Sequence, residues 1–436
     1  MPTVPRIRFT TISARRPRPV RIATFPVVIL FATTLTILGG CGNDKPSAPG
    51  AATATGLGIV ASDYKKTSVS LYDPASGRLS EGCVTSAEEG PIVEQPLSGD
   101  VGLPSRAQSG GEIILIDREK AVLTFVDPTS CTPRAQLSVT TGGFEANPHD
   151  VIQVSAHKAY VTRYGSNPAP TGDLDRGDDV LVIDPLARDA SQEPILKSIS
   201  LTAFATSIGG ATLLARPDRG VLVDGKVYLT LGNLDENFVA GAARVAVIDT
   251  ATDAVVDVID LPDQKGCSAI TYVAAANCLY VSCGGAFSDL DQAAGSALVE
   301  IDLSGVTPVL GRIVAARKIG SRPLNLASAA VLGGTAFVGT FGVRDSKTQA
   351  VVTPDAFYAV ALATGAAVKL LEGGAYNFGV AAVDIVHRKV FLPDGDTVTP
   401  RVHVFDVSAD AATTVPAGVF EADPTGHLAP REIAWY

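Results

Sequence analysis

Four strand-like segments follow one another within residues 226–273: KVYLT (226–230), RVAVID (244–249), AVVDVI (254–259) and SAITYV (268–273). Valine, isoleucine, threonine and tyrosine are frequent in them, and these residue types favour strands. Several of the segments are apolar on both faces, as a strand must be when its sheet is covered on both sides. The first three segments therefore predict one small sheet, and the fourth opens the next sheet of the same kind.

The first two of these segments form a pair of strands, and such a pair recurs seven times along the chain. The first strand of each pair carries a large aliphatic or aromatic residue, namely Ile59, Ile114, Tyr160, Tyr228, Tyr280, Phe337 and Phe391. The second strand usually ends in aspartate, at Asp73, Asp127, Asp184, Asp249, Asp302, Leu362 and Asp406. A turn built on the aspartate side chain explains that residue without a catalytic role. Units of about 45 to 70 residues cannot bury their own apolar faces, so they must stack. The sequence predicts an all-β fold, a seven-bladed β-propeller.

The two ends of the repeat region are each incomplete. Residues 57–62 begin at the second strand of a blade, whereas residues 431–436 have the pattern of an innermost strand with no successor. We therefore expect the N-terminal and C-terminal strands to complete one blade together, which removes exposed sheet edges. The propeller is predicted to span residues 57–436.

Some of these strands resemble a known repeat. Tyr160-Val161-Thr162, Tyr228-Leu229-Thr230 and Val247-Ile248-Asp249-Thr250 are similar to the β-propeller repeats named after the tetrapeptide Tyr-Val-Thr-Asn. The resemblance covers about residues 57–436, and Leu362 and the first repeat depart from it. At the level of repeats the chain is also similar to the propeller subunits of quinoprotein amine dehydrogenases. In those proteins the chemistry belongs to a partner subunit, so the resemblance implies a propeller but no reaction.

The first 56 residues predict where in the cell the protein is located. Six arginines precede an apolar run at residues 22–38, which ends in Leu38-Gly39-Gly40-Cys41. This pattern resembles a bacterial lipoprotein signal, which implies removal of residues 1–40 and a lipid on Cys41. Residues 41–56 are rich in Ala, Pro, Ser, Thr and Gly and predict a flexible linker. We expect a lipid-anchored protein of the bacterial cell envelope, with Gly42 favouring the outer membrane; a transmembrane anchor is the alternative.

The net charge of the chain limits the kinds of partner that the protein can bind. Removing the six arginines of residues 1–40 from the 35 basic residues leaves 29 against 45 acidic residues, a net charge of about −16. A strongly acidic surface repels phosphate backbones, so we expect no nucleic acid partner. We expect a monomer, and the sequence does not identify its protein or small-molecule ligand.

The loops that enter the innermost strands carry the candidate site. They recur as Asn147-Pro148-His149-Asp150, Arg216-Pro217-Asp218-Arg219, Arg322-Pro323-Leu324-Asn325 and Ala429-Pro430-Arg431-Glu432, with Tyr376-Asn377-Phe378 at the corresponding place. Such loops converge on one face of a propeller, which predicts a ligand funnel. The predicted ligand-binding residues are His149, Asp218, Arg219, Arg322, Asn325, Asn377 and Arg431, with His427 beside them. The alternative is that the prolines set the strand entrance and the polar groups cap the backbone.

The functional prediction is a non-catalytic binding or scaffold module. The chain lacks His-Glu-x-x-His and Gly-x-Ser-x-Gly, the most recognisable metalloprotease and hydrolase motifs. The alternative is a lactonase-like hydrolase or lyase that uses His149 or His427 as a general base, with arginines orienting an anionic substrate. Asp150 and Val151 follow His149, so the second histidine that lactonase propellers carry near this point is missing.

We predict no cofactor, but calcium remains an alternative. Asp173, Asp175, Asp178 and Asp179 lie in one long loop, and carboxylate oxygens are the ligands that calcium prefers. The loop lacks the fifth-position ligand and the closing glutamate of a calcium loop, so we interpret it as a solvated acidic rim.

Cysteines fit an oxidising compartment. We expect disulfides between Cys267 and Cys283 and between Cys83 and Cys131. Five cysteines follow Cys41, so these two pairs would leave Cys278 free.

Overall fold

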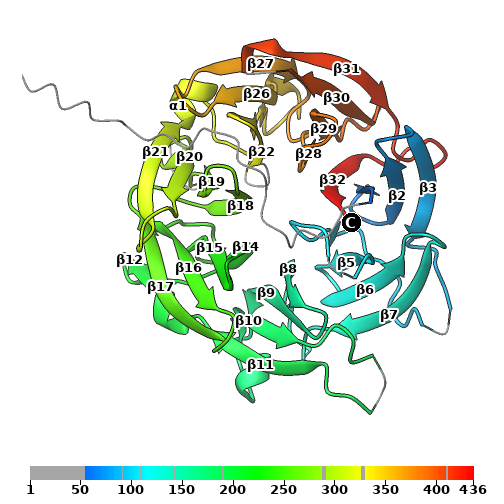
Figure 1. Cartoon of the computed structure of the whole chain (residues 1–436), viewed down its shortest axis with the longest axis vertical. Coiled ribbons are helices and arrows are strands. Elements are labelled where there is room, and N and C mark those ends of the chain that lie inside the picture. The colour runs from blue at the N-terminus through cyan, green and yellow to red at the C-terminus, as the bar shows by residue number, and fades with distance from the viewer. Residues whose placement is uncertain are drawn as a thin grey trace, which may run out of the picture. The chain divides into compact units, whose positions relative to one another are not determined.

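The computed structural model describes residues 55–90, 92–108, 110–141, 143–188, 191–286, 291–325, 329–408 and 411–436. The expected signal peptide, Cys41 and almost all of the linker lie outside these residues. Seven four-stranded antiparallel sheets form a ring of blades (Figure 1). The all-β seven-bladed propeller is confirmed.

Blades 1 to 3 lie in the N-terminal half of the chain. Blade 1 contains β1 (Leu57–Ser62), β2 (Thr67–Asp73), β3 (Arg78–Thr85) and β32 (Pro430–Trp435). Blade 2 contains β4 (Val101–Gly102), β5 (Ile113–Asp117), β6 (Val122–Asp127) and β7 (Thr132–Ser138). Blade 3 contains β8 (Pro148–Ser155), β9 (Lys158–Ser166), β10 (Gly177–Ile183) and β11 (Ile195–Ser200).

Blades 4 to 7 complete the ring. Blade 4 contains β14 (Pro217–Val223), β15 (Lys226–Leu231), β16 (Ala243–Asp249) and β17 (Ala254–Leu261). Blade 5 contains β18 (Cys267–Val273), β19 (Cys278–Gly284), β20 (Ser296–Asp302) and β21 (Val309–Ala315). Blade 6 contains β22 (Ala330–Leu332), β23 (Thr335–Thr340), β26 (Ala356–Ala361) and β27 (Ala367–Glu372). Blade 7 contains β28 (Ala382–Asp384), β29 (Lys389–Asp394), β30 (Arg401–Val407) and β31 (Thr414–Phe420).

Smaller elements decorate the loops. Two short hairpins are formed by β12 (Thr206–Ile208) with β13 (Ala211–Leu213) and by β24 (Val343–Arg344) with β25 (Val351–Thr353). The helical turns are η1 (Asp173–Asp175), η2 (Thr202–Phe204), η3 (Ala411–Thr413) and α1 (Ala316–Ile319). Within the described ranges, no helix is long and apolar enough to cross a membrane.

The ring closes through blade 1. The C-terminal strand β32 pairs antiparallel with β1, with Leu57 opposite Trp435 and Ile59 opposite Ile433. The sheet order β3-β2-β1-β32 therefore combines strands from both ends of the described chain, as expected.

Packing between neighbouring blades explains the recurring large residue. Tyr160, Tyr280, Phe337 and Phe391 are all fully buried, and so is Ile59 at the same place in blade 1. One apolar cluster fills the space between blades 4 and 5, and six further clusters fill other parts of the ring. Each blade therefore buries its apolar faces against its neighbours rather than within itself.

The recurring aspartate holds a turn. Asp73 Oδ1 accepts the Ala75 N–H at 2.9 Å, and Asp127 Oδ1 accepts the Thr129 N–H at 2.8 Å. Hydrogen bonds within these turns hold the pKa of both carboxyls below the usual value. The aspartate is a turn residue, as the sequence indicated.

The innermost strands of blades 6 and 7 begin at Ala330 and Ala382. The small residues around Gly379 and Ala381 precede β28 instead of belonging to it. A Cβ atom at Gly379 would lie 1.8 Å from the Arg431 carbonyl oxygen, so this backbone packs directly against β32. Contact between blades, and not pairing within a blade, explains the glycine there.

Both expected disulfides are present. Cys83–Cys131 joins β3 to the turn before β7 and so links blades 1 and 2, with Cα atoms 4.9 Å apart. Cys267–Cys283 links β18 to β19 within blade 5. The expectation for Cys278 is wrong, because none of the described cysteines is free.

Candidate functional site

The candidate site lies on one face of the ring, which we call the mouth face. The innermost strands begin there, and the loops between second and third strands lie there too. Three innermost strands open with the same triplet plan, Pro148-His149-Asp150, Pro217-Asp218-Arg219 and Pro430-Arg431-Glu432. In all three triplets the pairing with the neighbouring strand shifts register, and such a β-bulge re-aims the side chains beside it.

The third residues meet around the axis of the ring. Arg219 Nη2 lies 2.9 Å from Glu432 Oε1, and its guanidinium also lies 3.9 Å from Asp150 Oδ1 and 4.0 Å from Asp218 Oδ1. Arg118 adds a second cation, 3.5 Å from Glu432. Burial alone would lower the pKa of Arg219, but the carboxylates of Glu432, Asp150 and Asp218 raise the pKa above its ordinary value. We call Asp150, Arg219 and Glu432 the axial hub; it ties blades 3, 4 and 1 together.

Asp150 is the most enclosed carboxylate of the hub. It accepts the Ser105 N–H and hydroxyl at 2.9 and 2.8 Å and the Gly220 N–H at 2.9 Å. Burial raises the pKa of Asp150, although the charge of Arg219 and these hydrogen bonds oppose that shift. The carboxylate therefore joins the loop after β4 to blade 4.

His149 and Asp218 form a pair just above the hub. His149 Nδ1 lies 2.8 Å from Asp218 Oδ1, and the two side chains are 18% and 14% exposed. The imidazole stacks on the Tyr164 ring at 4.4 Å between centroids, and the Arg216 guanidinium lies 5.1 Å from the same ring. Burial alone would raise the pKa of Asp218, but His149 and Arg219 hold the pKa well below its usual value. The sequence analysis placed His149, Asp218 and Arg219 together, and the structure brings them together.

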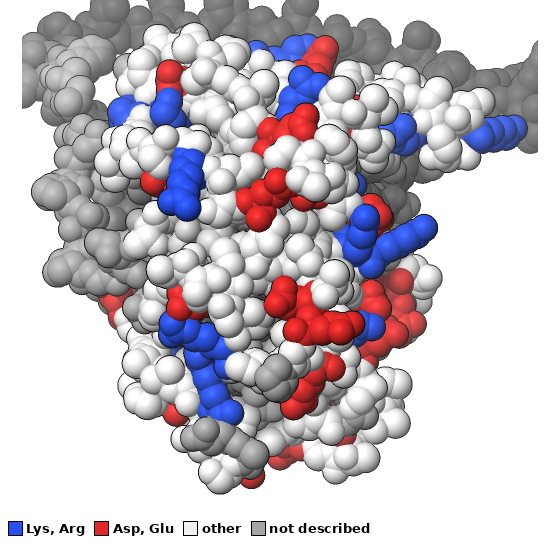
Figure 2. All heavy atoms as spheres, turned by 90° about the vertical axis from the view of Figure 1, so that its right-hand side faces the viewer, with Lys and Arg blue, Asp and Glu red and all other residues white. Residues whose placement is uncertain are grey.

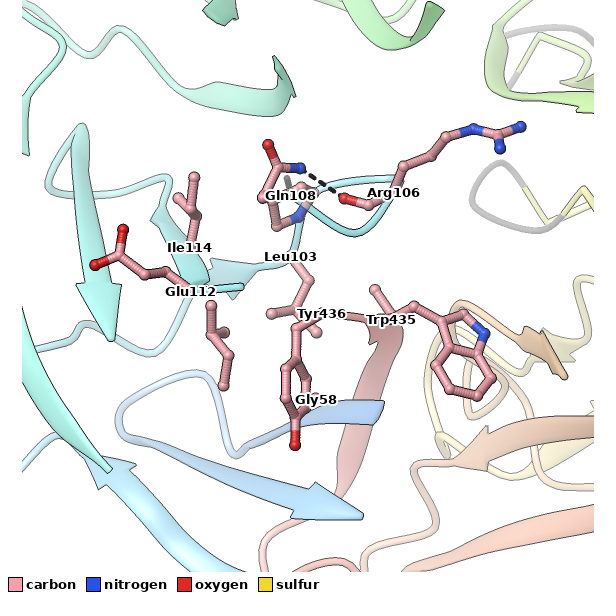
Figure 3. A pocket seen from close by; sticks show the side chains of 11 residues that line it. Gly58, Leu103, Arg106, Gln108, Glu112, Ile114, Trp435 and Tyr436 are labelled. Atoms are coloured by element: carbon pink, nitrogen blue, oxygen red, sulfur yellow. Dashed lines mark hydrogen bonds between the residues drawn. The ribbon is translucent and has the colours of Figure 1, made fainter. Parts of the chain in front are cut away.

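The chain itself enters the centre of the ring on the far side of the hub. Five of the other blades join their first two strands by tight turns, whereas residues 103–112 make a longer connection between β4 and β5. Leu103 O accepts a hydrogen bond from Arg219 Nη1 at 2.6 Å, and Arg106 Nη2 reaches Tyr272 O of blade 5 at 3.1 Å. Between this connection and the C-terminal residues Trp435 and Tyr436 lies a cavity of about 10 Å³ (Figure 3), the space of about one water molecule.

The remaining predicted residues lie on the mouth face but do not join the hub. Arg431 donates from Nε to Ser62 O at 3.2 Å, and its guanidinium lies 4.7 Å from the Tyr64 ring. Arg322 Nε donates to Phe341 O at 3.3 Å. These guanidiniums belong to blades 1 and 6.

The two predicted asparagines are buried and serve the backbone. Asn325 Nδ2 donates to Phe378 O at 2.6 Å, so the side chain links blades 6 and 7. The Asn377 N–H donates to Asp355 Oδ2 at 2.6 Å. The Asn325 side chain thus caps backbone, whereas Asn377 is held through its own backbone N–H.

His427 is separate from the predicted funnel. Its side chain is 68% exposed and lies 3.5 Å from Glu421 Oε2. Within the part of the chain that the structure describes, no hydrogen bond or ion pair joins it to His149 or the hub.

The acidic loop residues also cap backbone. Asp178 accepts the N–H groups of Ala215 and Arg216 at 3.0 and 2.6 Å, at the entrance to blade 4. Asp355 accepts the Tyr376 and Asn377 N–H groups at the entrance to blade 7. Each carboxylate thus holds the loop of the following blade.

The prediction of a solvated acidic rim fits the long loop of blade 3 only in part. Asp175 is buried and binds Thr171 and Gly172, and Asp179 is buried against Arg163, with Arg163 Nε and Nη2 at 2.7 and 2.6 Å from its two oxygens. Asp173 is exposed and pairs with Arg176 at 3.0 Å. Among the described residues, no group of three or more His, Cys, Asp or Glu side chains is placed to hold a metal ion.

The comparisons with known proteins show the fold alone. No protein-family model matches the chain, and no curated protein matches it in sequence. A solved structure of a putative 6-phosphogluconolactonase from Bacteroides fragilis is similar at 10% identity and a TM-score of 0.53, over 90% of this chain and 100% of that one. A hypothetical selenium-binding protein from Sulfolobus tokodaii is similar at 10% identity and a TM-score of 0.53, over 88% and 93%. The β-propeller domain of Cps50 from Myceliophteria thermophila follows at 11% identity and a TM-score of 0.51, over 80% and 94%. The chain is a β-propeller that resembles several differently named propellers to a similar degree.

Proposed function

We propose that this protein is a membrane-tethered, non-catalytic propeller that binds its ligand on the mouth face. The observation that carries this proposal is the occupied centre of the ring. Arg219 contacts three carboxylates and one carbonyl of its own chain, and beyond it Arg106 reaches across to Tyr272 O of blade 5. A ligand therefore meets the loops and side chains of the rim before it meets the hub.

The proposal includes a lipid tether and a location in the bacterial envelope. The lipoprotein-like motif ending at Cys41 supports a lipid anchor and a place in the bacterial envelope. A single acyl chain anchors weakly, so stable attachment requires the several chains of a bacterial lipoprotein. On the side of the ring that carries β3, basic and acidic side chains lie interspersed (Figure 2), which supports a partner other than nucleic acid.

A second function is favoured by one observation, the His149–Asp218 pair. A carboxylate on Nδ1 orients an imidazole and leaves Nε2 to accept a proton, which is the arrangement of a general base. The second candidate is therefore a hydrolase or lyase of the mouth, with His149 as the base.

One experiment separates the two functions. The full chain, purified from membranes in detergent, is tested for thermal stabilisation and for turnover with a panel of lactones, esters, peptides and oligosaccharides. A bound ligand at about 100 times its dissociation constant stabilises the fold by roughly 2.7 kcal/mol, which the unfolding midpoint registers. We expect stabilisation by one class without turnover, and the same behaviour in His149→Ala. Turnover that falls at least about a hundredfold in His149→Ala would establish the enzyme instead.

The tether has its own test. Cys41→Ser removes the thiol that would carry the lipid, so the variant should leave the membrane fraction, while the unaltered chain should remain there. Equal membrane association of the Cys41→Ser variant would contradict the lipid anchor and favour a transmembrane anchor.

A further inference from the structure

Three exposed aromatic side chains share an unfavourable backbone conformation. Tyr64, Phe238 and Tyr376 are 67%, 56% and 55% exposed, and their φ angles are 64°, 59° and 64°. A bulky residue is strained in this left-handed region, where glycine and asparagine are preferred. More than half of the Tyr64 and Tyr376 side chains stays in water, so packing within the chain does little to offset the strain at these two residues. Strain kept at these exposed tyrosines points to a contact outside the chain.

Tyr64 and Tyr376 are connected through Arg431. The Arg431 guanidinium lies 4.7 Å from the centre of the Tyr64 ring. A Cβ atom at Gly395 would lie 2.4 Å from Arg431 Nη1, so the guanidinium packs on the backbone of blade 7. The Gly395 N–H donates to Asn377 O at 2.8 Å, one residue from Tyr376. These contacts place the two tyrosines on neighbouring parts of the mouth face.

The line of side chains continues into blade 6. The Tyr376 ring lies 5.9 Å from the Phe341 ring, and Phe341 O accepts the Arg322 Nε–H at 3.3 Å. We call Tyr64, Arg431, Tyr376, Phe341 and Arg322 the mouth strip. It contains three aromatic rings and two guanidiniums, and it runs from blade 1 across blade 7 to blade 6.

The two guanidiniums of the strip are available to an anion. Both are half-buried and bind backbone carbonyls, and within the described part of the chain neither pairs with a carboxylate. Asp63, Asp345 and Asp396 of the neighbouring loops each accept backbone N–H groups of their own turns. Elsewhere Arg163, Arg188 and Arg219 are all paired with carboxylates.

We infer that the mouth strip binds an anionic oligosaccharide, a chain of sugars that carry carboxylates. The C–H groups of a sugar face are weakly positive and pack on the negative face of an aromatic ring. A sugar carboxylate pairs with a guanidinium through charge-assisted hydrogen bonds. A chain of sugars needs no deep pocket, because it can lie along rings and cations on an open rim. This inference rests on the proposed function and names the class of ligand.

The test compares two probes of equal length on the full chain in detergent: a hexamer of galacturonic acid and a hexamer of glucose, titrated by calorimetry. We expect the galacturonate hexamer to bind more tightly and to lose affinity as salt rises, because salt screens exposed charge pairs. Tyr376→Asn, Tyr64→Asn and Arg431→Gln should each weaken binding about tenfold, equivalent to roughly 1.4 kcal/mol.

Phe238→Asn is the matched control. Phe238 is equally exposed and equally strained but lies in blade 4, away from the strip. Its substitution should leave galacturonate binding unchanged. The unfolding midpoints of the three asparagine variants should stay level or rise, because asparagine suits the left-handed conformation. A Tyr376→Asn variant that binds less but unfolds no earlier separates a ligand role from a structural one.

Several outcomes would overturn the inference. Equal affinity for both hexamers, binding of neither, or galacturonate binding that Tyr376→Asn and Arg431→Gln leave unchanged would each do so. If an acidic peptide binds the strip and galacturonate does not, the inference fails while the proposed function stands. If the protein cleaves galacturonate and His149→Ala abolishes cleavage, the proposed function fails as well.

Discussion

The third position of the proline triplet is buried in three repeats. It holds Asp150, Arg219 and Glu432, which form the axial hub. Each follows its strand-opening proline by two residues, and each side chain is less than a tenth exposed. The second residues of the same triplets, His149, Asp218 and Arg431, remain nearer the mouth. A β-bulge at the same place in three strands thus accompanies the separation of a buried structural cluster from groups that can meet a ligand.

We expect substitutions of the axial-hub residues to lower the free energy of unfolding by different amounts. Arg219→Met leaves Glu432, Asp150 and Asp218 without their shared cation, and we expect a loss of about 3–5 kcal/mol in the free energy of unfolding. Glu432→Gln keeps a hydrogen-bond acceptor beside Arg219 and should cost about 1–3 kcal/mol. Urea unfolding of both variants measures the two values. Equal costs would mean that Arg219 does not bridge the three carboxylates.

The lowered pKa of Asp218 predicts how the stability of the fold depends on pH. The pKa of Asp218 is lower in the folded state than its unfolded value of about 3.9. The carboxyl therefore stabilises the fold above that unfolded value, and this contribution is lost as the pH falls through the folded-state pKa. Asp218→Asn should be less stable than the unaltered chain at pH 7, and the difference should shrink in acid. Glu89→Gln, at an exposed loop, serves as the control and should show no such convergence.

At the scale of elements, strands were predictable and their loops were only partly so. Tyr160, Tyr228 and the terminal aspartates mark the strands because stacking between blades demands large buried residues and tight turns at fixed places. The strand starts at Ala330 and Ala382 do not follow from local sequence pattern, because contact with the neighbouring blade decides them.

The candidate site was predictable where local pattern and geometry coincide. The proline triplets indicated His149, Asp218 and Arg219, but the sequence analysis missed Glu432, which occupies the third place of the last triplet. Aligning the triplets would have found it. Nothing in the sequence indicated that residues 103–112 reach blade 5 or that Asp178 and Asp355 cap the next blade, because those contacts join residues far apart in the chain.

The two disulfides should differ in their contributions. In the chain-entropy description, closing 48 residues stabilises by about 4 kcal/mol and closing 16 residues by about 3 kcal/mol. The double variant Cys83→Ala/Cys131→Ala should therefore unfold at lower denaturant than Cys267→Ala/Cys283→Ala. Guanidinium unfolding under non-reducing conditions gives the order, and the reverse order would show that contacts around Cys267 and Cys283 outweigh loop length.

For the whole molecule, β32 completes blade 1 and so closes the ring. A chain that lacks residues 430–436 leaves β1 with an open edge and Arg219 without Glu432. We expect it to associate into oligomers or aggregates, because an unpaired edge recruits other strands. A chain that begins at residue 55 keeps every blade and is the control. Light scattering distinguishes the two, and a monodisperse monomer of the C-terminally shortened chain would show that β32 is dispensable for closure.

Blade 1 is the first blade to be synthesised and the last to be finished. Its three outer strands precede every other blade in the sequence, but β32 follows all of them. Blades 2 to 7 can fold in order as they emerge, whereas the ring stays open until β32 has been made. If residues 1–40 direct export, the same delay keeps the chain from closing before it has been threaded across the membrane.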